Sequence, residues 1–140
     1  MIFPNKTSYA DRQPFVFFDA AEATDSFVAG NIASFDEHNM VGFQLTLTDL
    51  GDITTLSIIV ESSIDGGTTY GQQVAVATTG GTTVVTKNQY DFSMASYTAG
   101  DTVTFIVTPI KGDHLKVSMK ADDSVTDGGD ITLVGMFGWV

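Results

Sequence analysis

Apolar and polar residues alternate at every second position through most of the chain, and this pattern limits what the chain can fold into. Between positions 41 and 47, the apolar residues Val41, Phe43, Leu45 and Leu47 are separated by glycine, glutamine and threonine. Side chains of a β-strand point to its two faces in turn, so this alternation predicts a strand with one buried face. The same period recurs at 56–60, 74–76, 84–94, 103–107 and 115–121. The chain is therefore predicted to be almost entirely β.

Turn signals separate the predicted strands. The segments DLGD, DGG, TGG, TAGD, KGD and TDGGD each join two alternating stretches, and glycine and aspartate are the residues that turns favour. About eight short strands in one domain are typical of a sandwich or a barrel. For a chain of 140 residues without cysteine, we expect a single-domain antiparallel β-sandwich. A jelly roll is the preferred topology, and an immunoglobulin-like sandwich is the alternative.

Two stretches depart from the alternation because they are apolar at both parities. They are PFVFFDA at 14–20 and ITLVGMFGWV at 131–140. A strand of this kind is expected to be covered on both faces, since large exposed apolar patches are rare on monomers. The second cover is either a neighbouring subunit or a loop of the same chain, such as residues 21–39. The subunit alternative predicts a homo-oligomer.

The first thirteen residues show no strand pattern and are expected to form an extended arm before a sandwich domain at 14–140. The arm contains Pro4 and two of the six basic residues of the chain. The side chains that we expect to contact a partner are apolar or basic, from the arm and from the C-terminal end. They are Ile2, Phe3, Tyr9, Arg12, Phe137 and Trp139.

The charge of the chain argues against several classes of function. Six basic residues stand against seventeen acidic ones, which gives a formal net charge of −11. Nucleic acid and anionic membranes are not expected as partners, because both are bound through Lys and Arg. No Gly-x-Ser-x-Gly motif is present, and His38 and His114 lack an evident third metal ligand. We therefore expect no enzymatic activity, no catalytic residues, no cofactor and no metal site.

The segment ADDSVTDGGD at 121–130 is the one place where oxygen ligands concentrate. It carries Asp122, Asp123, Asp127 and Asp130. Oxygen-rich loops can bind calcium, but this spacing is not that of an EF-hand. The prediction is an exposed polar turn between two strands, with calcium binding left open.

The segment ESSIDGGTTY at 61–70 contains a spaced set of turn-forming residues. They are Ser63, Asp65, Gly66, Gly67, Thr69 and Tyr70. The pattern resembles the Asp-box of sialidase-like β-propellers, in which the aspartate accepts backbone bonds and an aromatic ring packs under the turn. It occurs once here, the chain is too short for a propeller, and Arg12 is its only arginine. We therefore interpret the segment as a structural hairpin turn.

A second resemblance covers more of the chain. LSIIVESSIDGGTTYGQQ at 56–73 and HLKVSMKAD at 114–122 resemble stretches in virion proteins of tailed bacteriophages. The resemblance implies a capsid decoration or cement protein on the virion surface, with the major capsid protein as partner. It also implies a homotrimer, because phage shells offer three-fold positions. A tail or fibre component would fit the same stretches.

A carbohydrate-binding module is the alternative from another functional class. Such modules use sandwiches of this size with exposed aromatic rings that stack on sugars. The aromatic residues near the two ends of the predicted domain are candidates for this role. They are Phe15, Phe17, Phe18, Phe137 and Trp139. Packing in the core or against a subunit is the preferred interpretation of these rings.

Overall fold

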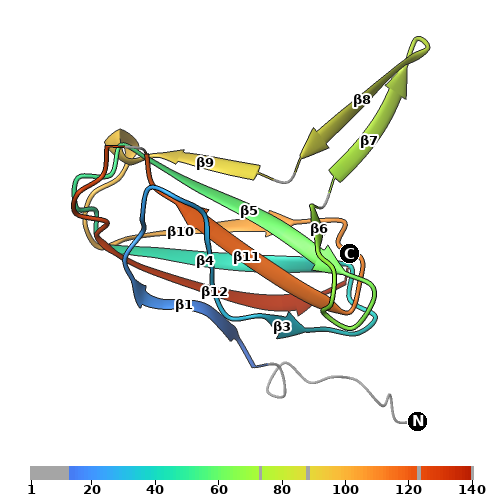
Figure 1. Ribbon diagram of the computed structural model, residues 1–140, viewed down its shortest axis with the longest axis horizontal. Helices are drawn as coiled ribbons and strands as arrows, with labels where there is room; N and C mark the ends of the chain where they lie inside the picture. The colour runs from blue at the N-terminus through green and yellow to red at the C-terminus, as the bar shows by residue number, and fades with distance from the viewer. Residues whose placement is uncertain (1–12, 73, 88, 123, 140) are drawn as a thin grey trace.

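Two antiparallel sheets lie face to face around one hydrophobic core (Figure 1). The computed structural model describes residues 13–72, 74–87, 89–122 and 124–139. The first sheet has the order β1 (Phe15–Ala21), β12 (Asp130–Gly138), β4 (Met40–Asp49) and β10 (Asp101–Val107). The second has β11 (His114–Lys120) and β5 (Thr55–Ser63) at its centre, with β2 (Val28–Ala29) and β3 (Ala33–Ser34) beside β11, and β6 (Gly71–Gln72) and β9 (Gln89–Ser93) beside β5. A short 3₁₀ helix, Met94–Ser96, follows β9. The predicted antiparallel β-sandwich is confirmed.

The chain passes repeatedly from one sheet to the other. The first sheet receives β1, β4, β10 and β12, and the strands between them in sequence belong to the second sheet or to a separate hairpin. In an immunoglobulin-like sandwich, by contrast, the first two strands along the chain lie in the same sheet, whereas β1 and β2 lie in different sheets here. The observed order therefore favours the jelly roll, which stays the predicted topology.

The core is formed by the apolar residues of the period-two pattern. Leu45 and Leu47 of β4, Leu56 of β5 and Leu115 of β11 are all fully buried. Aromatic rings extend this core toward β10, where Phe105 stacks on Phe43 with ring centroids 5.1 Å apart. Burying a side chain of this size contributes about 1.5–3 kcal/mol, so the inward positions dominate the stability of the sandwich.

The doubly apolar character of PFVFFDA has a local cause that the sequence analysis did not foresee. The pairing of β1 with β12 shifts register between Val16 and Phe18. A β-bulge of this kind places two successive residues on one side of the strand, and Phe17 and Phe18 are 0% and 6% exposed. The bulge accounts for the second buried phenylalanine of β1 and leaves Val16 on the outer face, 39% exposed, so cover of that face by a neighbouring subunit stays a prediction.

The other doubly apolar stretch, β12, follows the alternation without a bulge at its centre. Ile131, Leu133 and Gly135 are buried on the inner side, whereas Met136 is 36% exposed on the outer side. Within 21–39, β2 and β3 pair with β11 in the opposite sheet, and Glu37 and His38 contact Trp139 at one end of this face without burying Met136. The loop alternative for the second cover is therefore wrong for Met136.

A separate hairpin of β7 (Val74–Thr79) and β8 (Thr82–Lys87) extends away from both sheets (Figure 1). Its two-residue turn consists of Gly80 and Gly81, both with positive φ, as the primed hairpin turns require. The predicted strands at 74–76 and around Val84 exist, but they pair with each other and not with the sandwich. Among the residues that the structure describes, no helix is long and apolar enough to cross a membrane.

Candidate functional site

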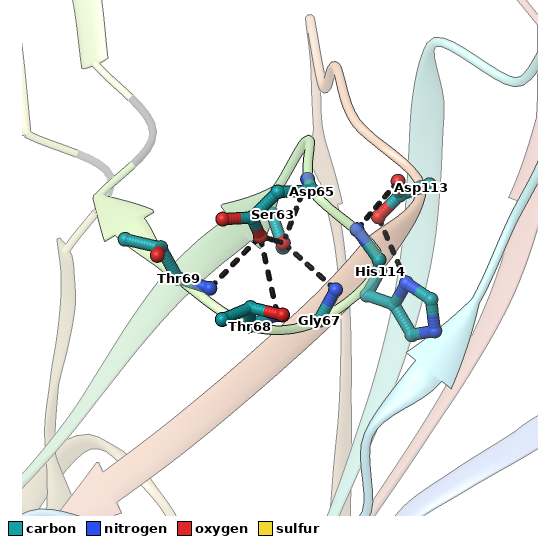
Figure 2. Close-up of polar contacts among 8 residues, drawn as sticks. Ser63, Asp65, Gly67, Thr68, Thr69, Asp113 and His114 are labelled. Carbon is teal, nitrogen blue, oxygen red and sulfur yellow. Dashed lines mark hydrogen bonds and ion pairs between the residues drawn. The ribbon is translucent and has the colours of Figure 1, made fainter.

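The turn after β5 is held by two side chains, Ser63 and Asp65 (Figure 2). The Ser63 hydroxyl donates to Asp65 at 2.6 Å and accepts the Gly67 amide at 3.0 Å. The same Asp65 oxygen accepts the backbone amides of Thr68 and Thr69 at 3.1 and 2.8 Å. These bonds lower the pKa of Asp65 from 3.8 to about 2, and the hydrogen bond from Ser63 is the largest cause. The carboxylate therefore supports the turn in its charged form.

A second loop, at the start of β11, completes the same corner of the sandwich (Figure 2). Asp113 accepts the amide of Gly66 at 3.0 Å and contacts the His114 imidazole at 2.8 Å. The hydrogen bond from His114 lowers the pKa of Asp113. Gly67 has a φ of +89°, and an added Cβ there would lie 3.1 Å from the Tyr70 hydroxyl and 3.5 Å from the His114 ring. The polar groups of this corner bond each other, which is the arrangement of a structural turn.

The opposite end of the sandwich contains a second group of aspartates with similar roles. Asp52 accepts the Thr126 amide and hydroxyl and the Asp127 amide, and these bonds lower its pKa. Asp122 accepts the Thr54 amide at 2.6 Å, and that bond is the largest cause of a pKa lowered to about 2. These carboxylates connect the loop before β5 to the loop before β12.

The segment 121–130, predicted as an exposed polar turn with calcium binding left open, lies at this end. One Asp130 carboxylate oxygen is buried without a hydrogen-bond partner, while Asp123 lies outside the described residues. Within the described ranges, no three His, Asp or Glu side chains come together at metal-binding distance. The geometry supports a polar turn.

The outer face of β10, β4 and β12 in the first sheet is different, because it carries no charged side chain over three consecutive rows. The strand register defines these rows across β10, β4 and β12, with β1 joining the middle one. We term this surface the uncharged face, and its residues are Thr102, Thr46, Thr132, Thr104, Gln44, Val134, Val16, Ile106, Gly42 and Met136. Its threonines lie toward one end and its apolar residues toward the other.

The apolar end of the uncharged face is hollowed above Gly42. An open groove of about 400 Å³ is lined there by residues that include Met40, Ile106, Met136 and Trp139. No heavy atom beyond its chain neighbours lies within 4 Å of the position that a Cβ on Gly42 would take. Ile106 stands beside the hollow in the same row and is 58% exposed. The surface thus places a protruding side chain next to a depression.

Trp139 lies at the rim of this groove, where contacts with Glu37 and His38 fix its ring. Its indole nitrogen donates to the Glu37 carbonyl at 2.8 Å, where the Glu37 backbone has a φ of +60°. Its ring lies 4.4 Å from the His38 ring and leaves 48% of the residue exposed. Phe137 points inward and stacks on Phe35 with centroids 5.0 Å apart. Of the two predicted contact residues at this end, only Trp139 is largely exposed.

The remaining predicted contact residues, Ile2, Phe3, Tyr9 and Arg12, lie outside the described residues. Gly42 and Ile106 were not predicted from the sequence, and the strand register brings them into one row with Met136 of the doubly apolar stretch 131–140. A signal for them was present, since each occupies an outward position of its strand without being charged. What the sequence lacked was the pairing of β10, β4 and β12, which are distant from one another along the chain.

Comparisons with known proteins agree with the fold. No protein-family model matches the chain, and a search of curated proteins returned no match. Among solved structures, the chain is similar to the crystal structure of the SPBc2 prophage-derived protein YomS. The TM-score is 0.50 at 15% sequence identity, over 91% of this chain and 92% of that chain. A likeness at this identity shows that the fold is shared across nearly the whole length.

Proposed function

We propose that this chain is a non-enzymatic structural protein of a tailed-phage virion, of the capsid decoration or cement type. It would bind the capsid surface, with the major capsid protein as its partner, and stabilise the shell. The observation that carries this proposal is the fold shared with a prophage-derived protein over nearly the full length of both chains. The resemblance of residues 56–73 and 114–122 to phage virion proteins points in the same direction.

The distribution of polar groups supports a role in binding rather than in chemistry. Asp65, Asp113, Asp52 and Asp122 use their carboxylates to hold turns. The uncharged face, by contrast, presents apolar surface to the outside, and surfaces of this kind mark contacts between proteins. Self-association and binding to the shell are both part of the proposal, and the homotrimer expected from shell symmetry is its most specific form.

Binding to shells tests the proposal directly. The purified chain would be mixed with empty shells assembled from the major coat protein of the same genome and then separated on a density gradient. We expect the chain to move with the shells and to raise the temperature at which they disrupt. A chain that stays at the top of the gradient at micromolar concentrations would contradict the proposal.

The N-terminal arm is expected to supply part of this binding. Lys6 and Arg12 are two of only six basic residues, and Ile2, Phe3 and Tyr9 offer apolar contacts. Deleting residues 1–12 should leave the melting temperature unchanged, because the described core begins after them. Binding to shells should weaken. Loss of folding, or undiminished binding, would remove the arm from the proposal.

Carbohydrate binding is the second candidate, and the exposed ring of Trp139 beside an open groove is the observation that favours it. Trp139 is the only tryptophan of the chain, so its fluorescence reports on this site alone. Titration with a panel of polysaccharide fragments should leave the emission unchanged if the protein is a cement protein. A saturable shift of the emission would favour the carbohydrate-binding module or a tail-fibre role.

A further inference from the structure

We infer that the uncharged face is where two copies of this chain associate, face to face, around a two-fold axis. This inference rests on the self-association part of the proposed function, with a two-fold dimer in place of the homotrimer, and does not depend on a phage shell. It extends the subunit contact predicted from the doubly apolar stretches, which supply Val16, Val134 and Met136, to Gly42 and Ile106 on the neighbouring strands.

The distribution of charge selects the occupant of this face. Each copy carries a net charge of −11, so two copies repel each other wherever their carboxylates approach. A partner of opposite charge would be attracted to the acidic surface elsewhere on the molecule. The uncharged face instead offers three rows of the sheet in which no charges of two copies oppose each other. A second copy of the same chain is therefore the partner that this surface fits best.

The shape of the face is also suited to a second copy. A two-fold interface must be complementary to itself, because the same patch is used by both partners. The row of Ile106, Gly42 and Met136 contains both a protrusion and a hollow. When two such rows face each other in opposite directions, the Ile106 side chain of one copy enters the hollow above Gly42 of the other. Trp139, at the rim, would then cover the edge of the contact.

The size of the face indicates how strong the association should be. Its ten residues, on strands about 4.8 Å apart and in rows about 6.6 Å apart, cover roughly 300 Å². A standard interface buries about 800 Å² on each partner, so this contact belongs to the weak class. We expect a dimer that dissociates in the micromolar range, and one that tightens when added salt screens the repulsion between the two acidic chains.

Paired glycine variants test the assignment. Gly42→Thr fills the hollow, and the fold should tolerate it, because nothing lies within 4 Å of the new Cβ and threonine suits a strand. Gly71→Thr is the matched control, since Gly71 is equally open but lies on β6 in the other sheet. Sedimentation velocity at low and high salt should give a dimer for the wild type and for Gly71→Thr. For Gly42→Thr the dissociation constant should rise at least tenfold.

Ile106→Lys provides an independent variant. Because Ile106 is 58% exposed, its replacement leaves the core intact. The added positive charge reduces the net repulsion between copies, so weaker association of this variant would come from the face itself. A wild-type chain that stays monomeric at both salt concentrations overturns the inference, and so does undiminished association of both Gly42→Thr and Ile106→Lys. Failure to bind shells would contradict the proposed function while leaving this result in place.

Discussion

Four Lys, Asp and Glu side chains lie in two rows on the outer face of β5, β9 and β11, whereas three rows of the outer face of β10, β4 and β12 contain none. On the first of these faces, Lys116 lies 3.6 Å from Glu61, and Ser57 donates to Asp91 at 2.6 Å. We term it the charged face. Both faces stand on the same kind of strand above the same core, so the backbone does not explain the difference.

The contrast shows that the residue types at outward positions depend on whether that face of the sheet contacts solvent or protein. Charged side chains on an outward face hold water, whereas exposed apolar patches mark contacts between proteins. The uncharged face has no charged side chains, although the chain has a net charge of −11, and Ile106 and Met136 are exposed on it. The charged face is consistent with contact to solvent, and the uncharged face with contact to protein.

The largest expected effect, a loss of folding stability, comes from a substitution on the inner side of the sheet that carries the uncharged face. Gly135 is paired with Phe43 on β4, and an added Cβ would lie 2.7 Å from the Phe17 ring and 3.2 Å from Val41. Gly135→Val should therefore lower the free energy of unfolding by about 1–3 kcal/mol through overpacking.

Gly42→Thr on the neighbouring strand is the matched comparison, because it points outward. Urea unfolding of both variants should show a large loss of stability for Gly135→Val and almost none for Gly42→Thr. Equal losses would mean that the assignment of inner and outer sides is incorrect.

Lowering the pH should change the folding stability and the dimer dissociation constant over different ranges of pH. The folded-state pKa values of Asp65 and Asp122 lie near 2, below the ordinary value of 3.8. Carboxyl groups with a lowered pKa stabilise the fold above the unfolded value, and this stabilisation is lost as the pH falls from about 4 toward 2. The melting temperature should therefore be flat at neutral pH and fall below about pH 4.

The dimer should become stronger, not weaker, as the pH falls, and this change should occur at higher pH than the loss of folding stability. The uncharged face has no group that titrates, so only the net charge of the two copies changes there. Between neutral pH and about pH 5, the dimer should tighten as carboxylates begin to protonate. Sedimentation at a series of pH values measures this, and a dimer that weakens over that range would mean that an ionisable group takes part in the contact.

The charged face should respond weakly to removal of its charges. The ion pair between Lys116 and Glu61 is partly exposed, and pairs of this kind contribute at most about 1 kcal/mol. Lys116 also lies over the Tyr70 ring at 4.7 Å, so Lys116→Met keeps much of its packing. Thermal melting should show a small change for Lys116→Met, and its dimer dissociation constant should equal that of the wild type. Loss of the dimer would move the contact to the charged face.

The smallest effect is expected from the hairpin of β7 and β8. Its strands pair with each other and with no other sheet, so replacing residues 74–87 by a short glycine-serine linker removes no rung of the sandwich. The melting temperature should change little, and the dimer should persist. A marked loss of either would show that the hairpin contributes to the core or to the contact.

The sequence predicted the inner face of the sandwich well, because burial there leaves a period of two. Val41, Phe43, Leu45 and Leu47 were assigned to a buried face and are at most 1% exposed. It failed at β1, where a bulge puts Phe17 and Phe18 on the same side. A bulge changes parity without any consistent residue type, so alternation alone could not reveal it.

The candidate site was less predictable than the fold. The turn at Ser63 and Asp65 is built from neighbours in sequence, and its residues could be recognised before the structure. The uncharged face joins Ile106, Gly42 and Met136, and Gly42 is more than sixty positions along the chain from each of the other two. Only the register of three strands shows that these residues share a row. The role of Gly42 in particular is invisible in sequence, since glycine in a strand has no side chain to indicate a face.

Site-specific cross-linking tests the central claim most directly. The chain has no cysteine, so a single one can be introduced on either outer face. Gln44→Cys lies in the middle row of the uncharged face, and Gln89→Cys is its matched counterpart on the charged face, with both glutamines exposed. Sheets packed face to face lie about 10 Å apart, which a short bis-maleimide spans. We predict that Gln44→Cys yields a covalent dimer and that Gln89→Cys remains a single chain. Dimer from Gln89→Cys alone, or from neither variant, would contradict the assignment of the uncharged face to self-association.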